Sequence, residues 1–163
     1  MGVSGCGKSS VGEELSRLLG VEFLDGDGYH PPANKEKMRQ GIPLQDEDRW
    51  PWLDILAKAL RESAIRNTRV IGACSALRRA YRDYLTTKAE EPVTFIHLSG
   101  SKELILSRIS VREHEYMPTS LLDSQFATLE LPQDDENAFT LNIDQSIDEL
   151  ASRAFETLNA SGK

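Results

Sequence analysis

Hydrophobic residues recur at helical spacing along much of the chain. Val11, Leu15 and Leu18 fall on one face at intervals of four and three residues, a spacing typical of an amphipathic helix. Similar spacing elsewhere, together with proline and glycine positions, predicts further helices, with Asp46 and Ser75 as caps of two of them. The predicted helices cover residues 11–19, 33–41, 47–60, a stretch behind Ser75, 104–109, 119–129 and 147–158.

Short apolar runs separate these helices. The runs cover residues 21–24, 69–74, 93–98 and 139–143. Strands that alternate with helices predict βαβ units, in which parallel strands form a sheet with helices on both faces. A chain of 163 residues is long enough for one domain with its own core. We therefore expect a single α/β domain over residues 1–163, with a three-layer αβα architecture.

The start of the chain contains a phosphate-binding motif. Residues 2–9 read GVSGCGKS and match the pattern G-x-x-x-x-G-K-[ST] in full. In such a loop the backbone N–H groups surround phosphate oxygens, Lys8 would reach the β- and γ-phosphates, and the Ser9 hydroxyl would bind Mg²⁺. The residues expected to bind the nucleotide are Gly2, Val3, Ser4, Gly5, Cys6, Gly7, Lys8, Ser9 and Ser10. Together with the alternating strands and helices, the motif predicts the three-layer αβα phosphate-loop NTPase fold. The motif alone leaves a kinase, a GTPase and a nucleotide-gated binding protein open.

Only Met1 precedes this loop, although a phosphate loop normally follows a central strand of the sheet. Without that strand, backbone groups of two neighbouring strands would be left unpaired, each at a cost of about 1–3 kcal/mol. We therefore expect about five to ten apolar residues ahead of Gly2 in the working protein. In the sequence as it stands, the first central strand of the parallel sheet is expected to be truncated.

Charge and cysteine content narrow the classes of function. Acidic residues outnumber basic ones by 26 to 19, for a formal net charge of −7, so a nucleic-acid-binding surface is not expected. Cys6 and Cys74 have no metal-ligand spacing, and two thiols without a signal peptide indicate a reducing compartment. No apolar run reaches the roughly 18 residues of a membrane span. The expected location is the cytoplasm, without a membrane partner.

Two carboxylates follow the first apolar run, at Asp25 and Asp27. In an extended stretch, residues two apart point to the same side, and ligands of open α/β sheets bind at this edge. One carboxylate could hold the water shell of the metal while the other takes a proton from an attacking hydroxyl. The alternative is a solvated turn, because Asp-Gly pairs favour turns.

Arginines gather near the same predicted edge. Arg78 and Arg82 are four residues apart on a predicted helix, as are Arg108 and Arg112, so each pair is expected to share a face. The second pair precedes an irregular segment that we interpret as a lid around 113–120. Arginines there could stabilise charge on a transferring phosphoryl group, although a solvated surface is the alternative for each one.

Other polar and aromatic residues give weaker signals. His30 lies in a loop before two prolines and could donate either to a substrate or to a backbone carbonyl. His97 is expected in the core or at an interface, because it lies within an apolar run. Trp50 and Trp52 are interpreted as packing residues, and Cys74 as a small buried side chain.

Longer stretches of the chain resemble the gluconokinases of the thermoresistant, phosphate-loop type. The matching stretches run from residue 1 to about residue 132 and read MGVSGCGKSSVG, FLDGDGYHPPAN, KM, GIPLQDEDRWPWL, CSALRRAYRDYL, HLSG and MPTSLLDSQFATLE. The resemblance implies a nucleoside-monophosphate-kinase-like fold. It further implies phosphorylation of D-gluconate at O6 with Mg·ATP, giving ADP and 6-phosphogluconate for the pentose phosphate pathway. Such enzymes often work as homodimers.

The resemblance also implies roles for individual residues. Asp27 would orient or deprotonate the acceptor hydroxyl, and Asp25 would lie nearer the metal. The DRWPW stretch would place Arg49 beside the acceptor, and YRDYL would place Arg82 there. One of Arg49, Arg78 and Arg82 would pair with the carboxylate of gluconate. Arg108 and Arg112 would be lid arginines.

Three departures from the family pattern stand out. Arg78 occupies a position that is usually lysine, and the two side chains are not equivalent at a bidentate contact. The lid pattern R-x-G-H-F-M is replaced by residues 112–117, REHEYM, so that the usual glycine and histidine become His114 and Glu115. The third departure is the absent first strand. The first bears on the acceptor contact and the second on lid closure and its pH dependence.

Two other functions remain open at the level of the sequence. A kinase of the same fold could act on shikimate, adenylylsulfate or a nucleoside monophosphate, although HPPAN and DRWPW favour the sugar acid. The chain could also be a nucleotide-binding regulatory module without turnover, for which Arg78, the altered lid and the short N-terminus would argue. A coupled assay for ADP release over a panel of acceptors separates these alternatives.

Overall fold

A computed structural model describes residues 1–110 and 119–161 of the chain. Arg112, Glu113, His114, Glu115 and most of the predicted lid lie outside the described residues. The helices are α1 (Lys8–Leu19), α2 (Pro32–Arg39), α3 (Asp46–Asn67), α4 (Arg79–Ala89), α5 (Lys102–Ser110), α6 (Thr119–Thr128) and α7 (Ile147–Ser161), with a short 3₁₀ helix η1 (Gly26–Tyr29). The strands are β1 (Glu22–Asp25), β2 (Val70–Ala73), β3 (Phe95–Ser99) and β4 (Ala138–Asn142).

The predicted alternation of helices and strands is confirmed, but both predicted caps are wrong. Asp46 is the first residue of α3, and the residue before it, Gln45, donates its backbone N–H to the Asp48 carboxylate at 2.9 Å. α4 begins at Arg79 rather than directly behind Ser75. Ala76 has a φ of 43°, in the left-handed region that a right-handed helix cannot include, so the helix starts only after it.

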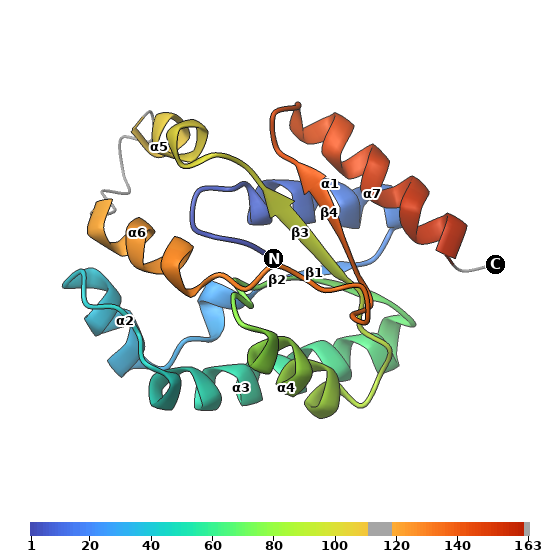
Figure 1. Ribbon diagram of the computed structural model, residues 1–163. Coiled ribbons are helices and arrows are strands. Elements are labelled where there is room, and N and C mark those ends of the chain that lie inside the picture. Colours follow the sequence, from blue (N-terminus) through green and yellow to red (C-terminus); the bar gives the residue numbers. More distant parts are fainter. Residues whose placement is uncertain (111–118, 162–163) are drawn as a thin grey trace.

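The strands form two parallel pairs rather than one continuous sheet. β1 pairs with β2 from Glu22 opposite Val70, and β3 pairs with β4 from Phe95 opposite Ala138. The N-terminus lies between the pairs (Figure 1). The Met1 carbonyl accepts the Leu98 N–H at 2.9 Å, and Gly2 donates to the Ser75 carbonyl at 3.1 Å. Met1 and Gly2 thus occupy the place of a central strand; the expected residues ahead of them stay a prediction.

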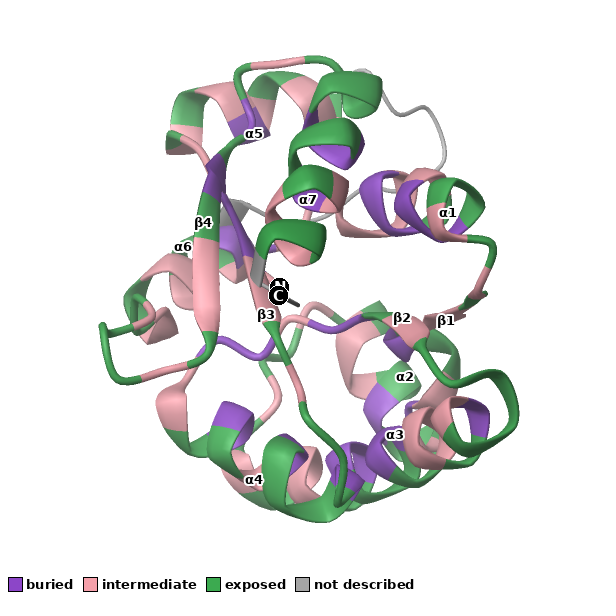
Figure 2. Ribbon diagram, turned by 90° about the vertical axis from the view of Figure 1, so that its right-hand side faces the viewer, coloured by how far each residue is buried: buried purple, intermediate pink, exposed green. Residues whose placement is uncertain are grey.

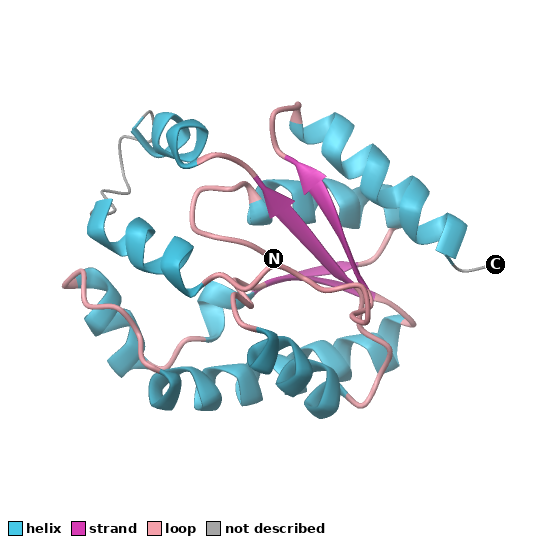
Figure 3. Cartoon of the chain, in the orientation of Figure 1, coloured by secondary structure: helices cyan, strands magenta, loops and turns pink. Residues whose placement is uncertain are grey.

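Helices cover both faces of the strands, as expected for a three-layer αβα fold (Figures 1 and 3). α1 and α3 both contact β2, and they pack against α7 and α4 respectively. Two clusters of buried side chains result, one under α1, α5 and α7 and one under α3 and α4 (Figure 2). Within the described residues, no helix is both long and apolar enough to cross a membrane.

Candidate active site

The phosphate loop turns directly into α1. Gly2, Gly5 and Gly7 have φ angles of 139°, 78° and 98°, which a residue with a Cβ rarely adopts. Val3 and Cys6 are buried, so these two can contribute only backbone groups to a ligand. The Lys8 ammonium crosses the loop and donates to the Val3 carbonyl at 3.0 Å. The loop therefore directs its N–H groups, the N-terminus of α1 and one cation to the same place.

Ser9 and Asp25 fit a magnesium ion. The Ser9 hydroxyl donates to Asp25 Oδ2 at 2.7 Å, so the first turn of α1 and the end of β1 meet at two oxygen ligands. Mg²⁺ prefers such oxygens and takes only one or two carboxylates from the protein, with water and phosphate for the rest. The described residues contain no cluster of three or more His, Cys, Asp or Glu side chains for a metal, and Mg²⁺ beside phosphates does not need one.

Asp27 lies close to Asp25 but not in the extended backbone that the sequence suggested. β1 ends at Asp25, and the chain turns into η1, where the Asp27 N–H donates to Asp25 Oδ1 at 3.0 Å. A Cβ on Gly26 would lie 2.4 Å from the Ala73 carbonyl oxygen, so the turn needs glycine to approach β2. Asp25 is therefore held toward α1, while the Asp27 side chain is 81% exposed.

His30 is a buried residue beside Asp27. Its ring stacks on Trp52 with centroids 4.1 Å apart, and its Nε2 lies 3.9 Å from Asp27 Oδ1. Burial, and then the charges of Arg49 and Lys35, lower the pKa of His30 to about 4, so the ring is neutral at pH 7. Trp52 donates to the Gly26 carbonyl at 2.8 Å, which confirms its packing role and fixes the turn that carries Asp27.

Of the three arginines predicted near the acceptor, Arg49 is the one whose guanidinium remains available to bind a substrate. Its guanidinium lies over the Tyr81 ring, 5.4 Å from the centroid, and this guanidinium makes no hydrogen bond or ion pair within the described part of the chain. The Arg49 charge is close enough to the His30 ring to lower its pKa, and Asp27 Oδ1 lies 3.9 Å from the same ring. An anionic group of a substrate could therefore bind Arg49 without displacing an internal partner.

Arg78 is tied to α3 instead of sharing a helix face with Arg82. It precedes α4 as its N-cap, and its Nη1 contacts both Asp46 carboxylate oxygens at 3.0 Å. The Tyr81 hydroxyl donates to the same carboxylate at 2.5 Å. Burial and this hydrogen bond raise the pKa of Tyr81 to about 12. Asp46 thus links the starts of α3 and α4, and it holds the Tyr81 ring that the Arg49 guanidinium contacts.

Arg82 contradicts the prediction that it faces the acceptor. Its side chain is 1% exposed, and its Nη2 donates to Glu136 Oε1 at 2.9 Å. The hydrogen bond from Arg82 lowers the pKa of Glu136, and Arg82 Nη1 donates to the Glu130 carbonyl at 3.0 Å. The Arg82 donors are thus paired with internal acceptors, and these bonds join α4 to the segment before β4. We therefore do not assign Arg82 to the substrate.

The lid arginines are only partly described. Arg108 of α5 donates from Nη2 to the Ile143 carbonyl at 2.5 Å, so it contacts the turn after β4 rather than the phosphate loop. A role over the phosphoryl group would require it to exchange that bond, and this role stays a prediction. Arg112 lies outside the described residues.

Three residues of this region carried no functional prediction. Asp46 had been interpreted only as a helix cap, and Glu136 lies in a polar stretch without a motif. Gln125, within the stretch MPTSLLDSQFATLE, contacts the phosphate loop at Ser4. Resemblance of that stretch to the gluconokinases was the only signal in the sequence that could have drawn attention to Gln125.

A phosphate loop facing a carboxylate turn and an available guanidinium is the arrangement of a small-molecule kinase of the phosphate-loop class. The sequence matches the shikimate kinase family over residues 4–158. It is 47% identical to the gluconokinase of Gluconobacter oxydans over 136 residues, covering 83% of this chain and 76% of that one. Identity to the thermoresistant gluconokinase of Escherichia coli is 40%, covering 97% and 90%. A gluconokinase structure from Sinorhizobium meliloti superposes with a TM-score of 0.84 at 39% identity, covering 100% and 95%. The chain therefore belongs to the gluconokinases, within the shikimate kinase family.

Proposed function

We propose that the protein transfers the γ-phosphoryl group of Mg·ATP to O6 of D-gluconate, giving ADP and 6-phosphogluconate. The observation that carries the acceptor assignment is Arg49, whose guanidinium has no hydrogen bond or ion pair among the described residues and lies near the His30 ring, which Asp27 also approaches. A sugar acid carries one carboxylate and several hydroxyls, and a guanidinium pairs with a carboxylate through two charge-assisted hydrogen bonds. The gluconokinase relatives support the same acceptor.

The described residues divide the work of phosphoryl transfer. The O6 oxygen forms the new bond to the γ-phosphorus, the bond to the β–γ bridging oxygen breaks, and its electron pair leaves with ADP. Asp27 orients the hydroxyl and accepts its proton, since its carboxylate is exposed beside the neutral His30. Lys8 and the loop amides stabilise the phosphates. Ser9 and Asp25 would hold the Mg²⁺, which neutralises phosphate charge when bound.

Of the three candidate arginines, we propose that Arg49 binds the gluconate carboxylate. Arg82 is occupied by Glu136, and Arg78 already shares the Asp46 carboxylate. Arg78 is still about two-fifths exposed, so it can attract the anion and keep the Tyr81 ring in position without being its main partner. The lysine that usually stands at position 78 in the family could hold Asp46 through a single ammonium contact.

The test is a coupled assay for ADP release with purified protein and Mg·ATP over D-gluconate, shikimate, adenylylsulfate and AMP. We expect turnover with gluconate alone, and ³¹P NMR of the product should place the phosphate on O6. Turnover with a different acceptor would move the protein to another kinase of the same fold. ATP binding without turnover on any acceptor would favour a regulatory module instead.

A further inference from the structure

Two helices from the C-terminal half of the chain contact neighbouring residues of the phosphate loop. α5 packs against Gly5, where an added Cβ would lie 2.6 Å from Ile109 Cγ1. α6 contacts the residue before it, because Gln125 hydrogen bonds to Ser4 across 121 positions of sequence. The loop is therefore held from two sides, and the contacts differ in kind: apolar packing on the side of α5 and hydrogen bonds on the side of α6.

Gln125 pairs with the backbone N–H and the hydroxyl of Ser4 at once. Its Oε1 accepts the Ser4 backbone N–H at 2.6 Å, and its Nε2 donates to the Ser4 hydroxyl at 3.0 Å. A primary amide presents an acceptor and a donor side by side, and no charged or apolar side chain of similar length presents both. These two bonds fix the orientation of the Ser4 peptide group. The peptide N–H groups that follow it along the chain are among those expected to bind phosphate.

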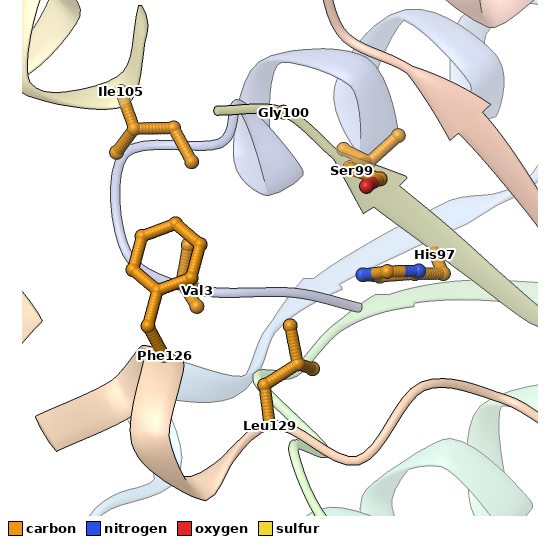
Figure 4. A pocket seen from close by; sticks show the side chains of 8 residues that line it. Val3, His97, Ser99, Gly100, Ile105, Phe126 and Leu129 are labelled. Atoms are coloured by element: carbon orange, nitrogen blue, oxygen red, sulfur yellow. The ribbon is translucent and has the colours of Figure 1, made fainter. Parts of the chain in front are cut away.

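Apolar packing alone does not fix the loop on the side of α6. A cavity of about 30 Å³ lies behind the loop, lined among others by Val3, Phe126 and Leu129 (Figure 4). That volume is room for about one water molecule, and Ile105 of α5 lines the same cavity. Val3 shares a buried cluster with Leu122 of α6, against which Phe126 packs, but this packing is incomplete beside the loop. The two hydrogen bonds from Gln125 add the directional contacts between the loop and α6.

We propose that Gln125 is a positioning residue for the nucleotide. It holds the Ser4 peptide so that the N–H groups after it, from Gly5 to Ser9, stay directed at the phosphates before ATP arrives. A binding loop that is already in its bound conformation loses less freedom when the ligand binds, which increases affinity. This inference rests on the phosphate loop being the nucleotide site, as proposed above, and it concerns ATP rather than the acceptor.

The test compares Gln125→Met, which keeps the length of the side chain and removes both hydrogen bonds, with the wild type. Each such bond contributes a few-fold, so we expect Mg·ATP affinity to fall about tenfold, with the KM for gluconate unchanged within about twofold. A loss of fold alone would not separate the two substrates in this way. Gln40→Met is the matched control, because among the described residues the side-chain amide of Gln40 hydrogen bonds only to the exposed Glu36 side chain.

Ser4→Ala provides a second, milder variant that removes only the 3.0 Å bond. It should weaken Mg·ATP binding about threefold in the wild type and have no further effect in the Gln125→Met background, because the bond is already absent there. Gln125→Met protein that binds Mg·ATP as tightly as the wild type overturns the inference, as does full additivity of the two variants. A wild type that fails to bind Mg·ATP would overturn the proposed function together with it.

Discussion

The phosphate loop and the acceptor side differ in how the chain assembles them. The loop is one continuous segment, residues 2–9, whose conformation follows from its own glycines and from the start of α1. The acceptor side brings together the η1 turn, the start of α3 and the start of α4, and ion pairs decide which of its arginines remains available. A local motif therefore specifies where the phosphates go, whereas the acceptor depends on pairings between distant residues.

The largest effect is expected on stability, from Arg82, whose side chain is buried and paired within the protein. Arg82→Ala would leave Glu136 buried without its partner, and breaking a buried pair in this way costs about 3–5 kcal/mol of unfolding free energy. Denaturant unfolding measures this loss. Arg39→Ala is the control, because its pair with Glu36 is exposed and should contribute little to the free energy of unfolding. Loss of gluconate binding in a stable Arg82→Ala protein would contradict the assignment of Arg82.

The next largest effect is expected at the phosphate loop. Lys8→Met removes the only side-chain cation of the loop motif, and kcat should fall about a hundredfold or more, as for the loss of one donor to developing charge. Steady-state kinetics at saturating gluconate and ATP measures the change. Lys58→Met, on the exposed surface of α3, should behave as the wild type. A decrease of less than tenfold would show that the loop amides suffice without Lys8.

A smaller, selective effect is expected at Arg49. Arg49→Ala should raise the KM for gluconate about 30-fold and leave the KM for ATP unchanged, since a charge-assisted hydrogen bond contributes about 1.5–3 kcal/mol. Arg78→Ala should raise the gluconate KM by a smaller factor, because Arg78 is paired with Asp46. If Arg78→Ala had the greater effect, the roles of the two arginines would be reversed.

The smallest effect concerns pH. Burial, together with the charges of the N-terminal ammonium and Arg82, lowers the pKa of His97 from 6.5 to about 4. Between these values the unfolded chain binds a proton that the folded protein refuses, so stability is full above pH 6.5 and is lost as the pH falls toward 4. The part of the loss due to His97 should be about 2 kcal/mol, and it should be absent in His97→Gln, where the similar contribution of His30 remains. Unfolding curves at pH 7 and pH 4.5 measure it; equal losses in both proteins would assign the effect elsewhere.

The sequence predicted best what neighbouring residues determine. The alternation of strands and helices followed from local patterns, and the structure confirms it. The nucleotide and metal roles of the phosphate loop, Ser9 and Asp25 stay predictions, which the contact between the Ser9 hydroxyl and Asp25 Oδ2 supports. The side chain of Arg82 pairs with Glu136, 54 positions away, and Ser4 pairs with Gln125, 121 positions away. Spacing along the chain could not reveal either contact. The left-handed backbone at Ala76 likewise separated Arg78 from the helix face that it was expected to share with Arg82.

The most direct measurement of the account compares two acceptors in two proteins. D-Glucitol has the carbon chain of gluconate with a hydroxymethyl group in place of the carboxylate, so it lacks the partner assigned to Arg49. We predict that the wild type prefers gluconate over glucitol by at least about 30-fold in kcat/KM, and that Arg49→Ala loses most of this preference. An Arg49→Ala enzyme that still discriminates like the wild type would contradict the claim that Arg49 recognises the acceptor.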